Sequence, residues 1–251
     1  MPDLPALSWI SASCPKPGNA GGENEDATAA DPGLLRFAVA DGATEAWQSG
    51  GWASHLAAEF VRQPPSPGNF PAWLATARGG WTPPAAGTAW YVEVKQEQGS
   101  FATLIGLEFR RPTKAPPGLL WKAVAVGDSC LLILRGGRFE VAFPLATVSE
   151  FGSRPALVPS STEVRCPTPE WLAGRAEAGD LFILASDAVA RYLLSLPTPA
   201  DQNPLLLAIQ GGAATKTPGV VLESLLGLNN VLNDDASIIA ILVPEPPEPS
   251  R

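Results

Sequence analysis

The sequence predicts an α+β fold, built as a single domain over residues 1–251. Short apolar runs typical of buried strands occur in groups, without strict alternation with helices, and several are joined by hairpin-like turns. Hydrophobic residues make up 45% of the chain, which is enough for a large core. Neither a linker nor an internal repeat divides the chain, so we expect one core from about residue 23 to residue 243.

Eight segments have the short apolar pattern of strands. The pair Gly136-Gly137, between two of these segments, is typical of a two-residue hairpin turn. Gly179-Asp180 precedes another segment, and we interpret Asp180 as a turn residue. The expected strands cover residues 34–40, 100–109, 119–126, 130–135, 138–143, 162–166, 181–185 and 236–243.

Six segments favour helices. The first has apolar residues at helical spacing, and Ser49 fits the position of its N-cap. In the third, Val and Tyr favour a strand while the Glu-Lys-Gln tail favours a helix, and we choose the helix. The expected helices cover residues 49–61, 70–77, 87–98, 188–196, 203–209 and 219–226.

Two segments predict irregular structure. Residues 144–160 are expected to form a loop or flap. The Pro- and Glu-rich tail, residues 244–251, is expected to be disordered.

Composition excludes several classes of function. The net charge of −8 and the pI of about 4.7 argue against nucleic acid as a partner, because no basic stripe would neutralise phosphates. The three cysteines, Cys14, Cys130 and Cys166, are widely separated and predict reduced thiols. The N-terminal segment has prolines at positions 2 and 5 and no basic region, so it matches a signal peptide poorly. No apolar run is long enough for a membrane span. We therefore expect a soluble, cytoplasmic protein, and a monomer.

Four short acidic motifs carry the functional signal. They are Glu25-Asp26, Asp41-Gly42, Asp187 and Asp234-Asp235. At least three of them begin or end an apolar run that predicts a strand. A carboxylate at such a place is costly unless it is paired or holds a cation. Carboxylates without a matching basic cluster favour hard cations such as Mg²⁺ or Mn²⁺, so the motifs predict a metal-dependent hydrolase.

The motifs, taken in order, resemble the signature of a known family. N-E-D-A, V-A-D-G, G-D-S, L-F-I-L-A-S-D and D-D-A-S are similar to the motifs of the PP2C-type (PPM) metal-dependent Ser/Thr protein phosphatases. The segments Asp41-Gly-Ala-Thr-Glu45 and Ser49-Gly-Gly-Trp-Ala53 resemble the bacterial branch. The resemblance runs from about residue 23 to residue 243. It implies a four-layer αββα sandwich, with two mainly antiparallel sheets flanked by helices.

The resemblance also implies a centre of two Mg²⁺ or Mn²⁺ ions, with a third, looser ion. Asp41 would bridge the two metals beside the Gly42 carbonyl, and Asp187 and Asp234 would bind the first metal. Glu25 would serve the second metal, largely through waters. Asp41, Asp187 and Asp234 are the expected catalytic residues. Two metals that share a water lower its pKa and present hydroxide to the phosphorus.

Three further aspartates have supporting roles by motif position. Asp128 would help Asp187 to hold the third metal, although it could instead cap the turn at Gly127-Ser129. Asp26 and Asp235 would not bind metal themselves but would help to position the residues that do. A shift of one residue would make Asp235 the ligand in place of Asp234.

Two further polar residues are interpreted as having no catalytic role. His55, the only histidine, lies within an expected amphipathic helix, and we interpret it as structural. We interpret Glu45 as a solvated loop carboxylate.

Two positions depart from the family pattern. Gly21 stands where an arginine commonly grips phosphate, and Ala43 stands where eukaryotic members carry histidine. Phosphate could be held by the metals, by amides of the glycine loop at residues 18–22, or by another arginine such as Arg154. The residues alone do not choose among these three.

The expected activity is hydrolysis of phosphoserine and phosphothreonine in a protein substrate, reversing a Ser/Thr kinase. The alternative is a pseudophosphatase that acts as a binding or regulatory module. A lesser option is a phosphatase for small phosphoesters.

Overall fold

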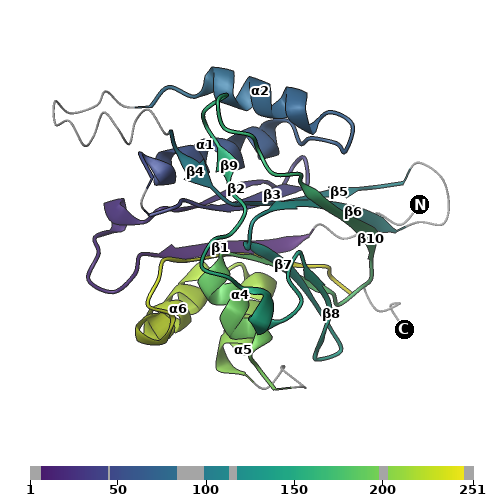
Figure 1. The fold of residues 1–251 in the computed structure, drawn as a ribbon. Helices are drawn as coiled ribbons and strands as arrows, with labels where there is room; N and C mark the ends of the chain where they lie inside the picture. Colours follow the sequence, from purple (N-terminus) through teal and green to yellow (C-terminus); the bar gives the residue numbers. More distant parts are fainter. Residues whose placement is uncertain (1–6, 45, 84–98, 113–117, 198–202, 246–251) are drawn as a thin grey trace, which may run out of the picture.

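Two stacked sheets lie between two layers of helices in the computed structural model of the chain (Figure 1). The structure describes residues 7–44, 46–83, 99–112, 118–197 and 203–245. The helix expected at 87–98 and most of the tail expected to be disordered lie outside these residues. The four-layer αββα sandwich predicted from the motifs is confirmed.

Both large sheets are antiparallel throughout. The first sheet, in spatial order, consists of β1 (Ser8–Cys14), β12 (Ala236–Leu242), β11 (Leu181–Ala185), β7 (Cys130–Arg135) and β8 (Arg138–Phe143). The second consists of β10 (Glu170–Ala176), β6 (Leu119–Val126), β5 (Leu104–Arg110), β3 (Arg36–Asp41) and β2 (Asp26–Asp31). A separate pair joins β4 (Phe101–Ala102) to β9 (Val158–Pro159).

Alternating side chains of the central strands fill the layers on both sides. In β12, Ile239 and Ile241 pack between the two sheets, while Ile238 packs toward the helices. Between the sheets, the Phe182 ring meets the Phe109 ring edge-on at 4.9 Å. Because both faces of these strands are buried, their sequences are almost continuously apolar, which is why the central strands were predictable.

Helices cover each outer face (Figure 1). On the second sheet, Phe60 of α1 lies so close that a Cβ at Gly106 would meet its ring at 2.3 Å. The helices over the second sheet are α1 (Ser49–Arg62) and α2 (Phe70–Gly80). Those over the first are α4 (Asp187–Leu194), α5 (Pro204–Thr215) and α6 (Pro218–Leu232). Two short 3₁₀ turns are η1 (Gly21–Glu23) and η2 (Val148–Glu150).

Several details of the sequence-based prediction were wrong. Residues 162–166 form no strand, and the strand in that region is β10. The strands β1 and β2 were not predicted. Ser49 is the first residue of α1, and Gln48 holds the N-cap position. Residues 144–160 are irregular as expected, apart from η2 and β9, and the hairpin at Gly136-Gly137 is confirmed.

Asp180 does more than form a turn. Its side chain is fully buried, and its two oxygens accept hydrogen bonds from the Arg135 guanidinium at 2.7 and 2.8 Å. The same carboxylate accepts a hydrogen bond from the Glu177 amide at 2.8 Å. The interaction therefore ties the end of β7 to the turn before β11.

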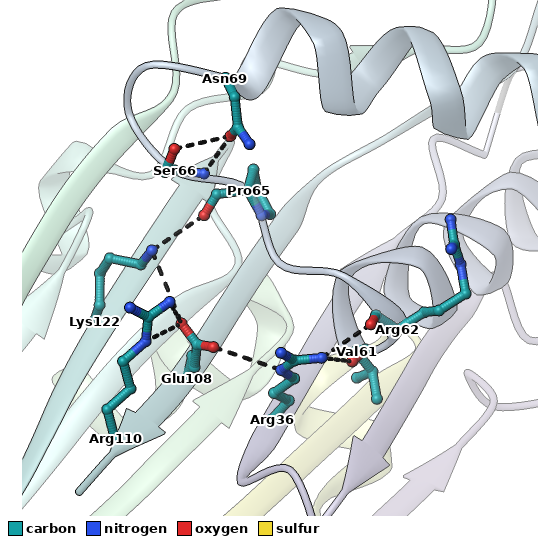
Figure 2. Close-up of polar contacts among 9 residues, drawn as sticks. All are labelled: Arg36, Val61, Arg62, Pro65, Ser66, Asn69, Glu108, Arg110 and Lys122. Atoms are coloured by element: carbon teal, nitrogen blue, oxygen red, sulfur yellow. Dashed lines mark hydrogen bonds and ion pairs between the residues drawn. The ribbon is translucent and has the colours of Figure 1, made fainter.

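Glu108 organises a polar cluster on the helix-covered side of the second sheet (Figure 2). It is buried and forms ion pairs with Arg110, Arg36 and Lys122, at 2.8, 3.5 and 3.9 Å. Arg36 also donates to the carbonyls at the end of α1, and Lys122 donates to the Pro65 carbonyl at 3.1 Å. The cluster thus fastens the connection between α1 and α2 to the sheet.

In the described part of the chain, no helix has both the length and the apolarity needed to cross a membrane. All three cysteines are free thiols, and Cys14 and Cys130 are buried.

Candidate active site

A cavity of about 890 Å³ opens where strand ends of both sheets meet. Five of the six residues predicted to bind metal line it: Asp41, Gly42, Asp128, Asp187 and Asp234. The sixth, Glu25, is not among the described lining residues. The fold therefore gathers motifs that lie far apart in the sequence around one space.

Each of the four aspartates that line the cavity sits at the end of a strand or in the turn beside one. Asp41 is the last residue of β3, and Asp128 lies in the turn from β6 to β7. Asp187 follows β11 as the first residue of α4, and Asp234 lies just before β12. Because β7, β11 and β12 are neighbours in the first sheet, these connections lie at the same end of its strands.

Burial and mutual repulsion perturb these carboxyl groups. Burial raises the pKa of Asp41 well above its usual range, and the charges of Asp26, Asp187, Asp128 and Asp234 raise it further. The pKa of Asp187 is also raised, mainly by burial and then by Asp234. Asp41, Asp128, Asp187 and Asp234 line one cavity, where like charges repel one another, so these aspartates form one electrostatic unit.

Asp26 lies directly opposite Asp41 in the ladder between β2 and β3. Burial raises the pKa of Asp26 to about 7, although the hydroxyls of Ser186 and Ser237 lower it. Neither carboxylate oxygen has a partner in good hydrogen-bond geometry among the described residues, so we regard these hydroxyls as close neighbours. Such an unpaired buried carboxylate is a place where a proton or a cation is favoured.

Asp128 is buried, and its Oδ1 atom has no hydrogen-bond partner among the described residues. Burial raises its pKa to about 6, and the charge of Asp187 also raises it. The Arg191 guanidinium lowers it. The unpaired oxygen favours the metal-binding interpretation of Asp128 over that of a simple turn cap.

Thr103 forms two hydrogen bonds with the backbone of Asp41. Its hydroxyl accepts a hydrogen bond from the Asp41 amide at 3.1 Å, and its own amide donates to the Asp41 carbonyl at 2.8 Å. The same hydroxyl pairs with the Ser129 hydroxyl at 2.6 Å, and so links β3 to the Asp128 turn. The sequence marks Thr103 only as a polar residue within an apolar run, and we did not predict its role.

Asp235 is used for positioning. Its two oxygens accept hydrogen bonds from the amides of Lys16 and Glu25, each at 2.7 Å. The side chain is buried, whereas Asp234 is exposed beside the cavity. This geometry favours the register in which Asp234 is the ligand and Asp235 the support.

The start of α1 packs closely against the Glu25 and Gly42 segments. The Ser49 hydroxyl donates to Glu25 Oε1 at 2.7 Å, so it serves Glu25 in place of the expected cap. A Cβ at Gly42 would meet the Ser49 backbone at 2.6 Å, and one at Gly50 would meet the Glu25 Cα at 3.0 Å. The small residues of the Ser49-Gly-Gly motif therefore allow the helix to approach.

His55 does not line the cavity. Its Nε2 atom pairs with the Ala77 carbonyl at 2.7 Å, and its ring lies 5.7 Å from the Trp52 ring and 5.5 Å from the Trp81 ring. This packing between α1 and α2 agrees with the structural interpretation.

The positions that depart from the family pattern fall in different places. Ala43 lines the cavity, but Gly21 lies in exposed η1, and nothing lies within 4 Å of a Cβ placed there. No residue of the glycine loop, residues 18–22, is among the described lining residues. Arg154 does line the cavity, whereas Glu45 lies outside the described residues.

The donor chemistry of the cavity fits Mg²⁺ or Mn²⁺. Carboxylates and a backbone carbonyl are the oxygen ligands that these ions prefer, and Asp26 and Asp128 have buried oxygens without partners. Within the described residues, however, no three His, Cys, Asp or Glu side chains are arranged to hold a metal ion. The described residues thus supply suitable donors close to one another without closing them around a single point.

No protein-family model matches the sequence, and no curated protein does. Solved structures do match the fold. The Ser/Thr phosphatase PstP/Ppp of Mycobacterium tuberculosis has a TM-score of 0.60 at 19% identity, covering 95% of this chain and 99% of that one. The catalytic domain of PstP with two manganese ions has a TM-score of 0.58 at 20% identity, with the same coverage.

PppA, a key regulatory component of the T6SS in Pseudomonas aeruginosa, has a TM-score of 0.54 at 20% identity. That match covers 94% of this chain and 97% of PppA. These similarities extend over nearly the whole chain and concern the same arrangement of layers. This chain therefore has the fold of the PP2C-type Ser/Thr phosphatases, which its ordered acidic motifs predict.

Proposed function

We propose that this chain is a Mg²⁺- or Mn²⁺-dependent phosphatase that hydrolyses phosphoserine and phosphothreonine in a protein substrate. One observation carries the proposal. Asp41, Asp128, Asp187 and Asp234, from four separate motifs, line a single cavity of about 890 Å³. A scaffold without chemistry has no evident need for four mutually repelling carboxylates at one place.

In this proposal, Asp41, Asp187 and Asp234 would hold two cations with the Gly42 carbonyl, and Glu25 would contribute through waters. Asp128 and Asp187 would hold a third ion. When bound, two such ions lower the pKa of a shared water and offset charge on the phosphoryl group. The water oxygen forms a bond to phosphorus as the ester oxygen–phosphorus bond breaks. One water proton ends on the seryl or threonyl oxygen, and inorganic phosphate is released.

Other residues of the chain keep the carboxylates in place. Thr103 fixes the Asp41 backbone, and Asp235 fixes the Glu25 amide. The PstP catalytic domain, which has the same fold, carries two manganese ions. Its likeness to this chain supports a similar metal requirement.

The remaining parts of the proposal concern partners and setting. A phosphatase of this class needs a Ser/Thr kinase that makes its substrate. A monomer would suffice, because one copy of the chain brings Asp41, Asp128, Asp187 and Asp234 together at the cavity. Three free thiols suit the reducing cytoplasm.

A second candidate function is a pseudophosphatase that binds phosphorylated partners. Two observations favour it: Gly21 replaces the phosphate-gripping arginine, and no three described side chains of the metal-binding types close around a metal. A matched assay separates the candidates. Purified protein is given an aryl phosphate, a small phosphoester and a phosphothreonine peptide with Mn²⁺, Mg²⁺ or EDTA.

The enzyme proposal predicts release of phosphate with either metal and none with EDTA. It also predicts loss of turnover in Asp41→Asn, with no loss in Glu140→Gln, which changes an exposed carboxylate on β8. Turnover of the small ester but not of the peptide would favour the small-molecule option. Absence of turnover, together with binding of the peptide, would favour the pseudophosphatase.

A further inference from the structure

We propose that Arg154 is the residue that binds the phosphate group of the substrate, in place of the arginine that is missing at Gly21. This inference rests on the proposed function and adds the substrate-binding residue to it.

Arg154 is the only basic residue among the sixteen described residues that line the cavity. The same lining contains four aspartates, so the cavity is strongly acidic around this one guanidinium. A phosphate dianion that enters such a space needs positive charge on the side that the metal ions would not cover. Among the described residues that line the cavity, Arg154 alone supplies that charge.

The guanidinium is free to meet a ligand. Arg154 is exposed, and within the described residues it has no hydrogen-bond or ion-pair partner. By contrast, Arg135, Arg36 and Arg110 are engaged by carboxylates. An arginine paired in that way would have to break its ion pair before it could bind phosphate, whereas Arg154 would not.

The loop that carries Arg154 is fixed at both ends. Before it, the Phe151 ring is buried and the Arg191 guanidinium lies 5.9 Å from its centre. After it, the Val158 carbonyl accepts a hydrogen bond from Trp52 Nε1 at 2.9 Å, and β9 pairs with β4. Only the few residues around Arg154 lie between these anchors, so its position is restricted.

The loop also lies close to the Asp128 turn. Gly127 has a φ of +100°, and a Cβ there would lie 2.6 Å from the Ala156 carbonyl oxygen. Only glycine allows this approach, which holds the loop against the turn that carries Asp128. The glycine therefore brings the loop that carries Arg154 next to the turn that carries Asp128, and both residues line the cavity.

Arginine suits this role because its planar guanidinium can form two parallel hydrogen bonds to phosphate oxygens, whereas lysine offers a point charge. The test uses Arg154→Gln, which removes the charge, and Arg154→Lys, which keeps it. Arg165→Gln is the matched control, because Arg165 is exposed on the next connection, between β9 and β10, and does not line the cavity. All variants change exposed side chains, so the folded state should persist, and thermal unfolding checks this.

Binding is measured by fluorescence anisotropy in Mn²⁺, with a peptide that carries a non-hydrolysable phosphonate in place of phosphoserine. The unphosphorylated peptide serves as the reference. Loss of a charge-assisted bidentate contact predicts about 10- to 100-fold weaker phosphonate binding in Arg154→Gln. Arg154→Lys should fall between Arg154→Gln and the wild type. Arg165→Gln and binding of the unphosphorylated peptide should change by less than about twofold, because neither involves a phosphate contact.

Phosphate release from a phosphothreonine peptide, measured in parallel, separates this inference from the proposed function. Wild-type turnover combined with an unchanged kcat/KM and unchanged binding in Arg154→Gln would overturn the role of Arg154 and leave the phosphatase standing. Arg154-dependent binding without any turnover would overturn the phosphatase and keep Arg154 as the phosphate-binding residue. Equal losses in Arg154→Gln and Arg165→Gln, or no phosphonate binding by the wild type, would also refute the inference.

Discussion

Asp26 and Asp41 stand directly opposite each other in the ladder between β2 and β3, at the edge that meets the cavity. Opposed residues of an antiparallel pair project to the same face, so the two carboxylates are close neighbours. Burial is the main cause of the raised pKa of both groups, and the charges of further aspartates also raise the pKa of each. The pair is thus unfavourable as two bare anions, and favourable once a proton or a cation joins it.

Asp41→Asn should separate stability from activity. Without metal, the substitution removes one of several repelling charges, so we expect the free energy of unfolding to rise by about 1–3 kcal/mol. Phosphate release should nevertheless be abolished and Mn²⁺ affinity reduced, because a predicted bridging ligand is lost. Urea unfolding in EDTA and calorimetric titration with Mn²⁺ measure the two effects. A destabilised variant that retains Mn²⁺ binding would contradict this account.

The metal-free protein should become less stable as the pH rises. Burial raises the pKa of Asp26 to about 7 and that of Asp128 to about 6, from a usual 3.8. Between about pH 4 and pH 7 the folded state therefore holds protons that the unfolded state has released. The stability that protonation of Asp26 and Asp128 adds is complete below the pKa that these groups have in the unfolded state. It is lost as the pH rises through their pKa in the folded state.

For Asp26 alone, we expect the free energy of unfolding to be on the order of 2 kcal/mol higher at pH 5 than at pH 8. Urea unfolding at several pH values in EDTA measures the slope, and Asp26→Asn should flatten it. Mn²⁺ affinity should change in the opposite direction and increase with pH, because the ion competes with protons. A flat profile in the wild type would show that these carboxyl groups titrate normally.

Asp234 and Asp235 should respond differently to the same change. Asp235→Asn weakens the hold on the Lys16 and Glu25 amides and should lower the free energy of unfolding by about 1–3 kcal/mol. Asp234→Asn should leave stability nearly unchanged and lower Mn²⁺ affinity, because Asp234 is exposed and lines the cavity. Thermal unfolding and Mn²⁺ titration of both variants test the assignment. The reverse pattern would make Asp235 the ligand.

Thr103→Val should impair the site through the backbone. The change leaves the Asp41 amide and the buried Ser129 hydroxyl without their shared partner, which costs about 1–3 kcal/mol of stability. Thr103→Ser keeps the hydroxyl and should recover most of this stability. Thr76→Val is the control, because the Thr76 hydroxyl is exposed and bonds only within its own helix. Equal stability in Thr103→Val and the wild type would show that the contact is dispensable.

Glu108→Gln should destabilise the fold without affecting the cavity. It leaves three cations around a buried position that has lost its charge, and we expect a loss of about 2–4 kcal/mol. Glu170→Gln, on the exposed edge of β10, is the matched control and should change stability by less than about 0.5 kcal/mol. Denaturant unfolding gives the comparison. Mn²⁺ affinity should be the same in both variants, and a change in Glu108→Gln alone would indicate coupling to the site.

The sequence predicted the central strands better than the edges. The runs that became β5, β6, β7, β11 and β12 are mostly apolar and largely buried on both faces. The strands β1, β2 and β10 each lie at the edge of a sheet and contain many small or polar residues. An edge strand gains its stability from a single neighbour, so its own sequence carries a weak signal.

The site was predicted through spaced motifs, with Asp26 and Asp235 as supporting residues, but the hydrogen bonds that support it were not predicted. Asp41, Asp128, Asp187 and Asp234 were singled out from the sequence, and they line one cavity. The hydrogen bonds of Thr103 and Asp235 depend on which strand ends meet, and local sequence does not reveal this. The same holds for Asp180, whose pairing with Arg135 spans 45 positions.

The central place of β12 in the first sheet has a consequence for synthesis. Every other strand of both sheets precedes β12 in the chain, yet β12 separates β1 from β11. While a ribosome is still making residues 236–242, β1 has no neighbour in its sheet, and Asp234 and Asp235 have only just been added. A nascent chain is therefore expected to have no working cavity until β12 emerges and inserts, so cation binding would follow translation.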